Sequence, residues 1–184
     1  MKMKKLFYLV VLLGGMGISA FAQKPYQRGI GLRIAPSSYY DVVSATYKFF
    51  VSDAGAIDLN AGVGFRHQPY YDNLGNRSDV RPFTLAVSAA YLHHFEIPVR
   101  GGGFTWFLGG GLTVYNAFFS KKGDYNGVGF GIFPTGGVDF KIPHIPLAVS
   151  ADYRPTIFFT QPNYYDSFYG SNFGLSARYT IGER

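Results

Sequence analysis

The tripeptide Tyr-Tyr-Asp occurs three times in this sequence, and each copy places two phenolic rings next to a carboxylate. A tyrosine offers a large contact area with little rotamer entropy to lose on binding. Rings and carboxylates that lie together can therefore form a surface that binds a sugar or a peptide. The candidate residues are Tyr39, Tyr40, Asp41, Tyr70, Tyr71, Asp72, Tyr164, Tyr165 and Asp166, with Asp124 and Tyr125 as a fourth aromatic and acidic pair.

Other residue types that can do chemistry give weaker signals. His67, Ser78 and Asp79 could supply a base, a nucleophile and an orienting acid, but no nucleophile elbow or fixed spacing accompanies them. His93 and His94 are adjacent, so in a strand they point to opposite faces and do not readily share a metal ion. The chain has no cysteine, which excludes a thiolate metal site and a disulfide. We therefore assign no catalytic, cofactor-binding or metal-binding residue from the sequence.

Residues 1–22 have the composition of a secretory signal peptide. Three lysines precede an apolar stretch that is too short for a membrane-spanning helix, and small residues up to Ala22 mark the expected cleavage site. Removing this segment leaves 14 of the 17 basic residues against 11 acidic ones, without a basic cluster, so we expect no nucleic-acid partner. Residues 23–184 then fit one domain.

The mature chain shows the period-two alternation of β-strands in eight stretches and has no helical period. In the clearest stretch, apolar side chains alternate with Asp58, Asn60 and glycines. In another, Pro143 and Pro146 confine the reversal of an antiparallel hairpin to a few residues, because proline cannot donate to a strand ladder. The eight predicted strands cover residues 29–34, 43–49, 57–65, 83–91, 104–114, 128–142, 147–154 and 173–181.

The connections between these strands alternate in length. Those after the second, fourth and sixth strands are short or bounded by proline, whereas those after the third, fifth and seventh are long and polar. The connection after the first strand is short although it belongs with the long set. An even number of strands, with short turns at one rim and longer loops at the other, is typical of outer-membrane barrels.

Alternation alone does not separate a membrane barrel from a soluble eight-stranded barrel of the lipocalin kind, because each has one apolar and one polar face. The polar face here is mostly Gly, Ala, Ser and Thr, which suit a narrow interior better than a solvated surface. We therefore predict that the apolar face contacts lipid. Because an unpaired buried charge is costly, we expect Asp152 to pair with Arg178 or another basic residue on a neighbouring strand. The predicted lumen charges are Arg33, Lys48, Asp58, Arg66, Asp139, Lys141, Asp152, Arg154 and Arg178.

Aromatic residues cluster toward the ends of the apolar face. Those expected near the short-turn rim, as an interfacial belt requires, are Tyr47, Phe49, Tyr91, Trp106 and Tyr179. The Tyr-Tyr-Asp repeats have a matching alternative interpretation, in which the tyrosines form the outer belt and the aspartates are turn residues. A soluble β-sandwich with these aromatic residues in its core is the alternative for the fold.

The signal peptide, the eight strands, the segment IPLAVSADYRP and the terminal FGLSARYTI resemble the small eight-stranded outer-membrane proteins of Gram-negative bacteria, a porin-like family with an outer membrane protein β-barrel domain. The resemblance covers nearly the whole mature chain. It implies an all-β, antiparallel up-and-down transmembrane barrel in the cell outer membrane, with both termini in the periplasm. It also implies outer-membrane lipid, lipopolysaccharide and the barrel-assembly machinery as partners. Family members commonly end on an aromatic residue, whereas this chain ends Ile181-Gly182-Glu183-Arg184.

That family includes adhesins, structural anchors and enzymes that modify lipid A. We expect this chain to be a structural or surface-interaction protein, with an extracellular ligand that the sequence does not identify. The alternatives are a lipid A-modifying enzyme, a narrow pore for small solutes and a soluble lipocalin-like binding barrel. Eight strands favour a packed lumen, although inward glycines such as Gly62 and Gly109 could leave a narrow water path.

Overall fold

The computed structural model describes residues 25–65, 68–71, 77–80, 82–98, 103–118, 126–162 and 165–182, and for 68–71 and 77–80 it describes the backbone alone. The expected signal peptide, residues 1–22, lies outside these ranges. Within them the chain forms strands and turns and no helix, so they contain no helix of the length and apolarity needed to cross a membrane.

The described residues form twelve strands. They are β1 (Arg28–Ile34), β2 (Val43–Phe50), β3 (Gly55–Gly64), β4 (Gln68–Tyr71), β5 (Arg77–Val80), β6 (Phe83–Ile97), β7 (Gly103–Phe118), β8 (Gly127–Lys141), β9 (Leu147–Tyr153), β10 (Thr156–Thr160), β11 (Phe168–Tyr169) and β12 (Phe173–Ile181). β4 and β5 form a separate hairpin, and the other strands belong to one antiparallel sheet.

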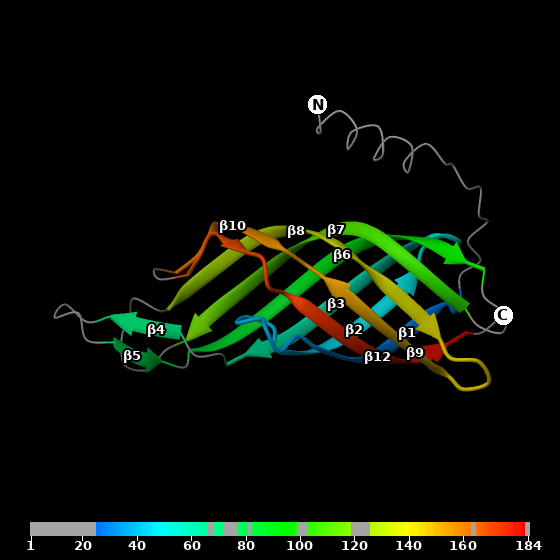
Figure 1. Cartoon of the computed structure of the whole chain (residues 1–184), viewed down its shortest axis with the longest axis horizontal. Helices are drawn as coiled ribbons and strands as arrows, with labels where there is room; N and C mark the ends of the chain where they lie inside the picture. Colours follow the sequence, from blue (N-terminus) through cyan, green and yellow to red (C-terminus); the bar gives the residue numbers. More distant parts are fainter. Residues whose placement is uncertain are drawn as a thin grey trace, which may run out of the picture.

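The large sheet closes on itself into an eight-stranded barrel. Each wall strand pairs with the next from β1 through β2, β3, β6, β7 and β8. β9 and β10 are two parts of one wall strand, since both pair with β8. β9 pairs with β12, and β12 pairs with β1, which completes the ring seen in Figure 1. The prediction of an eight-stranded antiparallel barrel is confirmed.

Parts of the wall are longer than the alternation indicated. β6 continues past Tyr91 to Ile97, and β7 continues past Val114 to Phe118. The connection expected to lack periodic structure contains the β4–β5 hairpin, which projects beyond the left end of the barrel in Figure 1. β6, β7 and β8 have 15, 16 and 15 residues, whereas β1 and β2 have 7 and 8, so the wall is uneven in height.

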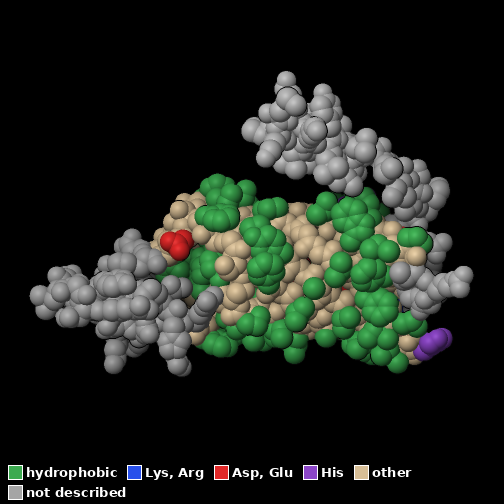
Figure 2. All heavy atoms as spheres, in the orientation of Figure 1, with side chains coloured by type: hydrophobic (Ala, Val, Ile, Leu, Met, Phe, Trp, Pro, Cys, Tyr) green, Lys and Arg blue, Asp and Glu red, His purple; other side chains and the backbone are tan. Residues whose placement is uncertain are grey.

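Side chains along the wall alternate between outside and inside. In β12 every second residue from Phe173 is exposed and those between are buried. Leu32 and Leu175 on the outside are 61% and 59% exposed, whereas Arg33 and Arg178 on the inside are 0% and 2% exposed. Figure 2 shows hydrophobic side chains spread over the visible face, with acidic and histidine side chains only near its two ends. The apolar face is therefore outside and the polar face inside.

The interior contains few aliphatic side chains. Ala90, Leu92, Phe107 and Phe133 form a small apolar cluster on the inner side of β6, β7 and β8. Most other buried side chains are charged, hydroxyl-bearing or aromatic. The barrel thus positions polar chemistry in its lumen, and the lumen is the place to look for a site.

Candidate functional site

A chain of alternating charges crosses the lumen. On β9, Asp152 accepts a hydrogen bond from Nη2 of Arg33 at 2.7 Å, and the same oxygen lies 2.8 Å from Nε of Arg154. On β3, Asp58 lies 2.9 Å from Nη2 of Arg154 and 3.3 Å from Nη2 of Arg178. All five side chains are buried. Each carboxylate is held between two guanidinium groups, which offsets the cost of removing these charges from water.

Hydroxyl groups supply further partners to this chain. Thr46 on β2 donates to Asp58 at 3.0 Å and accepts from Nε of Arg178 at 3.1 Å. Ser150 on β9 accepts from Nη1 of Arg178 at 2.7 Å. Thr46 and Ser150 are therefore hydrogen-bond partners of the Arg178 guanidinium as well as small side chains that fit the narrow lumen.

A second group of charges lies at the short-turn end, where β1 begins. Nζ of Lys48 lies 2.6 Å from Oδ2 of Asp139, and the hydroxyl of Tyr26 donates to the same oxygen at 2.8 Å. Nε2 of His94 is 3.9 Å from that oxygen. Tyr26 precedes β1, packs edge-on against Phe50 and is 1% exposed, and burial raises the pKa of its phenol. Tyr26, two residues before the first wall strand, therefore closes this end of the lumen.

The connection between β1 and β2 folds into the opposite end of the lumen. Asp41 in this connection accepts from Nη1 of Arg33 at 2.9 Å and from the hydroxyl of Ser38. Asn172 accepts from Arg33 at 3.0 Å and donates to the hydroxyl of Tyr40 at 2.7 Å. Burial raises the pKa of the Asp41 carboxyl, although the positive charge of Arg33 opposes the rise. The loop is thus tied to the lumen charges through Asp41.

Aromatic rings fill the same end. The ring of Tyr40 stacks on that of Tyr115 at 5.6 Å, and Phe158 meets Tyr115 edge-on at 5.3 Å. Tyr39 packs against Tyr165 at 5.1 Å. All five side chains are buried, and they come from the first loop, β7, β10 and the segment after β10. This aromatic cluster (Tyr39, Tyr40, Tyr115, Phe158 and Tyr165) closes the long-loop end of the barrel.

The lumen charges predicted from the sequence lie inside the barrel, apart from Arg66, which is outside the described residues. Lys141 lies at the short-turn rim, where its Nζ donates to the carbonyl groups of Ile142 at 3.1 Å and Ile145 at 2.7 Å. The remaining charges are Arg33, Lys48, Asp58, Asp139, Asp152, Arg154 and Arg178.

The partners of Asp152 differ in part from the expectation. Arg178 on the neighbouring strand β12 pairs with Asp58, on the far side of the lumen, instead of with Asp152. Asp152 is bound by Arg33, which lies on β1, one strand beyond β12. The long arginine side chains bridge across the narrow lumen, so direct strand adjacency does not decide the pairing.

The first Tyr-Tyr-Asp repeat and Tyr165 lie inside the barrel and not on the exposed surface that a binding role for these residues requires. Tyr39, Tyr40, Asp41 and Tyr165 are 2–7% exposed, because Arg33 binds Asp41 inside the lumen and the rings pack on one another. Asp166 is exposed. Only the backbone of Tyr70 and Tyr71, in β4, is described, and the candidates that lie outside the described residues are Asp72, Asp124, Tyr125 and Tyr164.

Of the other chemical candidates, the adjacent histidines are the ones whose side chains the structure describes. His93 is exposed and His94 is buried, so they point to opposite sides of the wall. In the part of the chain that the structure describes, no group of three or more His, Cys, Asp or Glu is placed to hold a metal ion. His67 and the side chains of Ser78 and Asp79 lie outside that part.

The contributors to the lumen network that the sequence did not predict include Tyr26, Asp41 and Asn172. A signal for Asp41 was available, because the predicted lumen charges contained more basic than acidic residues and needed a further carboxylate. With Asp41 included, the ion pairs described above join equal numbers of carboxylates and of lysine and arginine side chains. They are Arg33, Lys48, Arg154 and Arg178 with Asp41, Asp58, Asp139 and Asp152.

The buried charges of this lumen neutralise one another and make the barrel rigid. Its charges are occupied by one another, and aromatic side chains close both ends. Comparison of the chain with models of protein families, with curated proteins and with solved structures found no match.

Proposed function

We propose that this chain is an integral β-barrel protein of a bacterial outer membrane, with a structural or surface-interaction role and without catalytic activity. The observation that carries this proposal is the reversed polarity of the barrel. Arginine side chains such as Arg33 and Arg154 are buried, while large apolar side chains such as Leu32 and Leu175 are exposed around the outside. In water, both features cost free energy, because the apolar surface stays hydrated and the charges do not. A surrounding bilayer removes the first cost and explains the arrangement.

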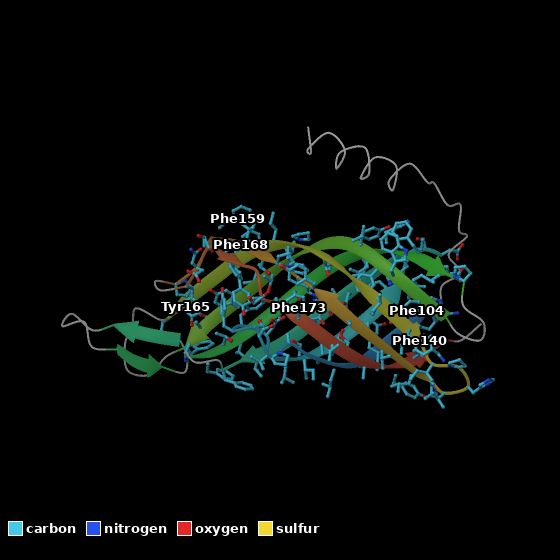
Figure 3. All side chains as sticks on the ribbon, in the orientation of Figure 1. Phe104, Phe140, Phe159, Tyr165, Phe168 and Phe173 are labelled. Carbon is cyan, nitrogen blue, oxygen red and sulfur yellow. The ribbon has the colours of Figure 1, made fainter. Side chains whose placement is uncertain are left out.

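Aromatic residues on the outer face of the wall support the same placement. In Figure 3, Phe159 and Phe168 lie toward the left end of the barrel, and Phe104 and Phe140 lie toward the right end. Two residues after Phe104 on β7, the exposed Trp106 stacks on Phe95 at 4.2 Å. Aromatic girdles at two levels are expected of a barrel whose wall passes through both membrane interfaces. The 9 residues of β12, tilted by about 40°, rise about 23 Å, close to the ~25 Å apolar band of such barrels.

The proposed orientation follows from the connections. The start of β1 and the end of β12 lie together at the short-turn end, where the amide of Gln27 donates to the carbonyl of Gly182 at 3.0 Å. We place this end in the periplasm and the β4–β5 hairpin outside the cell. Outer-membrane lipid and lipopolysaccharide then surround the wall, and the barrel-assembly machinery inserts it.

The closed lumen favours a structural or surface role over transport. Ion pairs occupy the interior, Tyr26 closes one end and the aromatic cluster closes the other. A lipocalin-like binding barrel needs an apolar cavity reached from one end, whereas charges and hydroxyl groups line this interior. The projecting hairpin is the part of the described chain best placed to meet an extracellular partner (Figure 1).

Membrane insertion is tested by refolding the mature chain, residues 23–184, with liposomes and floating them on a density gradient. We expect the protein to float, to resist alkaline extraction and to migrate faster on a gel before boiling than after it. A chain that remains folded, monomeric and soluble in buffer without detergent would refute the membrane placement.

Two further measurements test the orientation and the closed lumen. Protease added to intact cells is expected to cleave near the β4–β5 hairpin and to spare the wall strands. In planar bilayers we expect no sustained conductance steps, because the lumen is filled. Cleavage confined to permeabilised cells contradicts the orientation, and sustained conductance contradicts the closed lumen.

A further inference from the structure

The wall strand formed by β9 and β10 has an unusual junction with β8. β9 pairs with β8 from Lys141 and Ala148 up to Gly136 and Tyr153, and pairing resumes at Ile132 with Ile157. The register is the same on both sides of the gap, and it places Pro134 of β8 opposite Pro155. Two prolines therefore face each other in the middle of a wall where proline is normally avoided.

The two prolines occupy a position at which the strands should exchange two hydrogen bonds. The amides of Arg154 and Phe158 donate to Asn172 and Ser167, on the side away from β8. Backbone groups of successive residues point to opposite sides of a strand, so Pro155 is directed toward β8. On β8 the amide of Phe130 is directed toward Thr160, and by the same alternation Pro134 is directed toward Pro155. Neither proline has an N–H, so both bonds are absent.

β10 is weakly held on its other borders as well. Its pairing with β8 comprises three residue pairs and contains a register irregularity between Phe158 and Thr160. Its pairing with β11 comprises two pairs, whereas β9 and β12 share seven. Local opening is most favourable where few backbone hydrogen bonds hold a strand. β10 is therefore the least securely paired part of the described barrel wall.

The inner side of this stretch is lined by rings. Phe158 on β10 and Phe133 on β8 are each 3% exposed, and Tyr115 on β7 packs edge-on against Phe158. Thr135, next to Pro134, also points inward and is 4% exposed. If β10 separates from β8, these rings are uncovered together with Thr156 and Arg154, whose guanidinium lies 5.6 Å from the centre of the Phe133 ring, and they face the region that the proposed function assigns to the bilayer.

We propose that β10 opens laterally from β8 at the Pro134–Pro155 pair, and that an apolar molecule dissolved in the bilayer reaches the aromatic side chains of the lumen by this route. The proposal rests on the membrane placement given above. It differs from a pore, because entry is from the side of the barrel and both ends stay closed.

Backbone substitutions test the missing hydrogen bonds. Pro134→Ala and Pro155→Ala each restore one N–H donor, and the double variant restores both. We expect amide hydrogen exchange at Ile132 and Ile157 to slow about fivefold for each restored bond, which is the effect of an ordinary net hydrogen bond. Exchange at Val138 and Ala151, in the regular part of the same seam, is the internal control and is expected to be unchanged. Exchange that stays the same or accelerates at Ile132 and Ile157 would overturn the proposal.

Disulfide locks test the route itself, since the chain has no native cysteine. Ile132→Cys with Ile157→Cys closes the weak seam, and Val138→Cys with Ala151→Cys is a matched lock on directly paired, outward residues of the same two wall strands. The reporter is Thr135→Cys, treated in proteoliposomes with a maleimide that carries a long alkyl chain. We expect labelling in the unlocked protein and with the 138–151 lock, and loss of labelling with the 132–157 lock.

The outcomes separate this proposal from the membrane placement. Only protein that floats with the liposomes is scored, so failure to float refutes the proposed function. Floating protein that is not labelled, or that is labelled equally with both locks, refutes the lateral route alone. Equal labelling by a charged maleimide added to the aqueous phase would also overturn it, because the reporter would then be reached through an end of the barrel.

Discussion

The guanidinium group of Arg33 on β1 lies 2.7 Å from the carboxylate of Asp152 on β9, and these two strands are separated by β12 in the wall. The same guanidinium reaches Asp41 in the first loop and Asn172 before β12. One side chain thus ties together two wall strands, the loop that enters the barrel and the segment leading into the last strand. The lumen charges act as internal cross-links in a barrel that has few aliphatic residues inside.

Replacing Arg33 is expected to be strongly destabilising. Arg33→Met keeps much of the side-chain volume but leaves the buried carboxylates of Asp152 and Asp41 without one of their cations, which should cost about 3–5 kcal/mol of unfolding free energy. Urea unfolding in lipid vesicles measures this loss. Arg28→Met, on the exposed start of the same strand, is the control and should change stability by less than about 0.5 kcal/mol. Equal effects of the two substitutions would contradict the cross-linking role.

Tyr26 provides a test at the other end of the lumen. Tyr26→Phe keeps the packing on Phe50 and removes the hydroxyl that donates to Asp139. A hydrogen bond to a charged group contributes about 1.5–3 kcal/mol, so we expect a loss of that size in the same unfolding assay. Tyr179→Phe removes a hydroxyl from an exposed ring on the outside and should have little effect. If Tyr26→Phe leaves the unfolding free energy unchanged, this end of the lumen is closed by packing alone.

The carboxyl of Asp41 provides a test by pH. Because burial raises its pKa, the folded protein holds this proton more tightly than the unfolded chain does. Asp41 therefore adds stability below its unfolded pKa, near 4, and that contribution is lost as the pH rises through the raised folded pKa. The unfolding free energy of the wild type relative to Asp41→Asn should increase as the pH is lowered from about 7 to about 4. A change in the opposite direction would mean that Arg33 outweighs burial.

The outward face can be tested by adding a charge. Ala177 lies at the middle of β12 on its exposed face, so in a soluble protein Ala177→Arg would be nearly neutral. In a membrane barrel an arginine at this depth should cost about 2–4 kcal/mol, while Ile181→Arg at the end of the strand should cost about 0–1 kcal/mol. The unfolding free energies of the two variants, measured in vesicles, indicate how deep each position lies in the bilayer. Equal and small effects would argue against lipid around β12.

The wall of the barrel could be predicted from the sequence because strand alternation is a local property. Leu175 and Arg178 are separated onto outside and inside by their spacing alone. The ends of strands were harder to predict: β6 continues through His93-His94-Phe95, where polar and apolar residues do not alternate cleanly. The β4–β5 hairpin has no apolar face for a pattern to reveal.

The ion-pair partners within the lumen could not be predicted from a local sequence pattern. The pairing of Arg178 with Asp58 and of Arg33 with Asp152 is set by the register of strands around the whole ring and by the reach of arginine across it. Asp41 was assigned to an exposed loop because it follows two tyrosines in a turn-like segment. Its real environment is decided by Arg33, whose buried charge attracts a carboxylate from the nearest loop.

If the barrel lies in a bilayer as proposed, the unequal lengths of its wall strands determine how it meets the lipid. At a tilt of about 40°, the 7 residues of β1 rise only about 18 Å, whereas the 16 residues of β7 rise about 40 Å. A bilayer of constant thickness does not match both sides of such a body. In the proposed bilayer, a lean of the molecule or thinner lipid beside β1 would accommodate this difference, and either adjustment would orient the protein relative to its neighbours in the plane of the membrane.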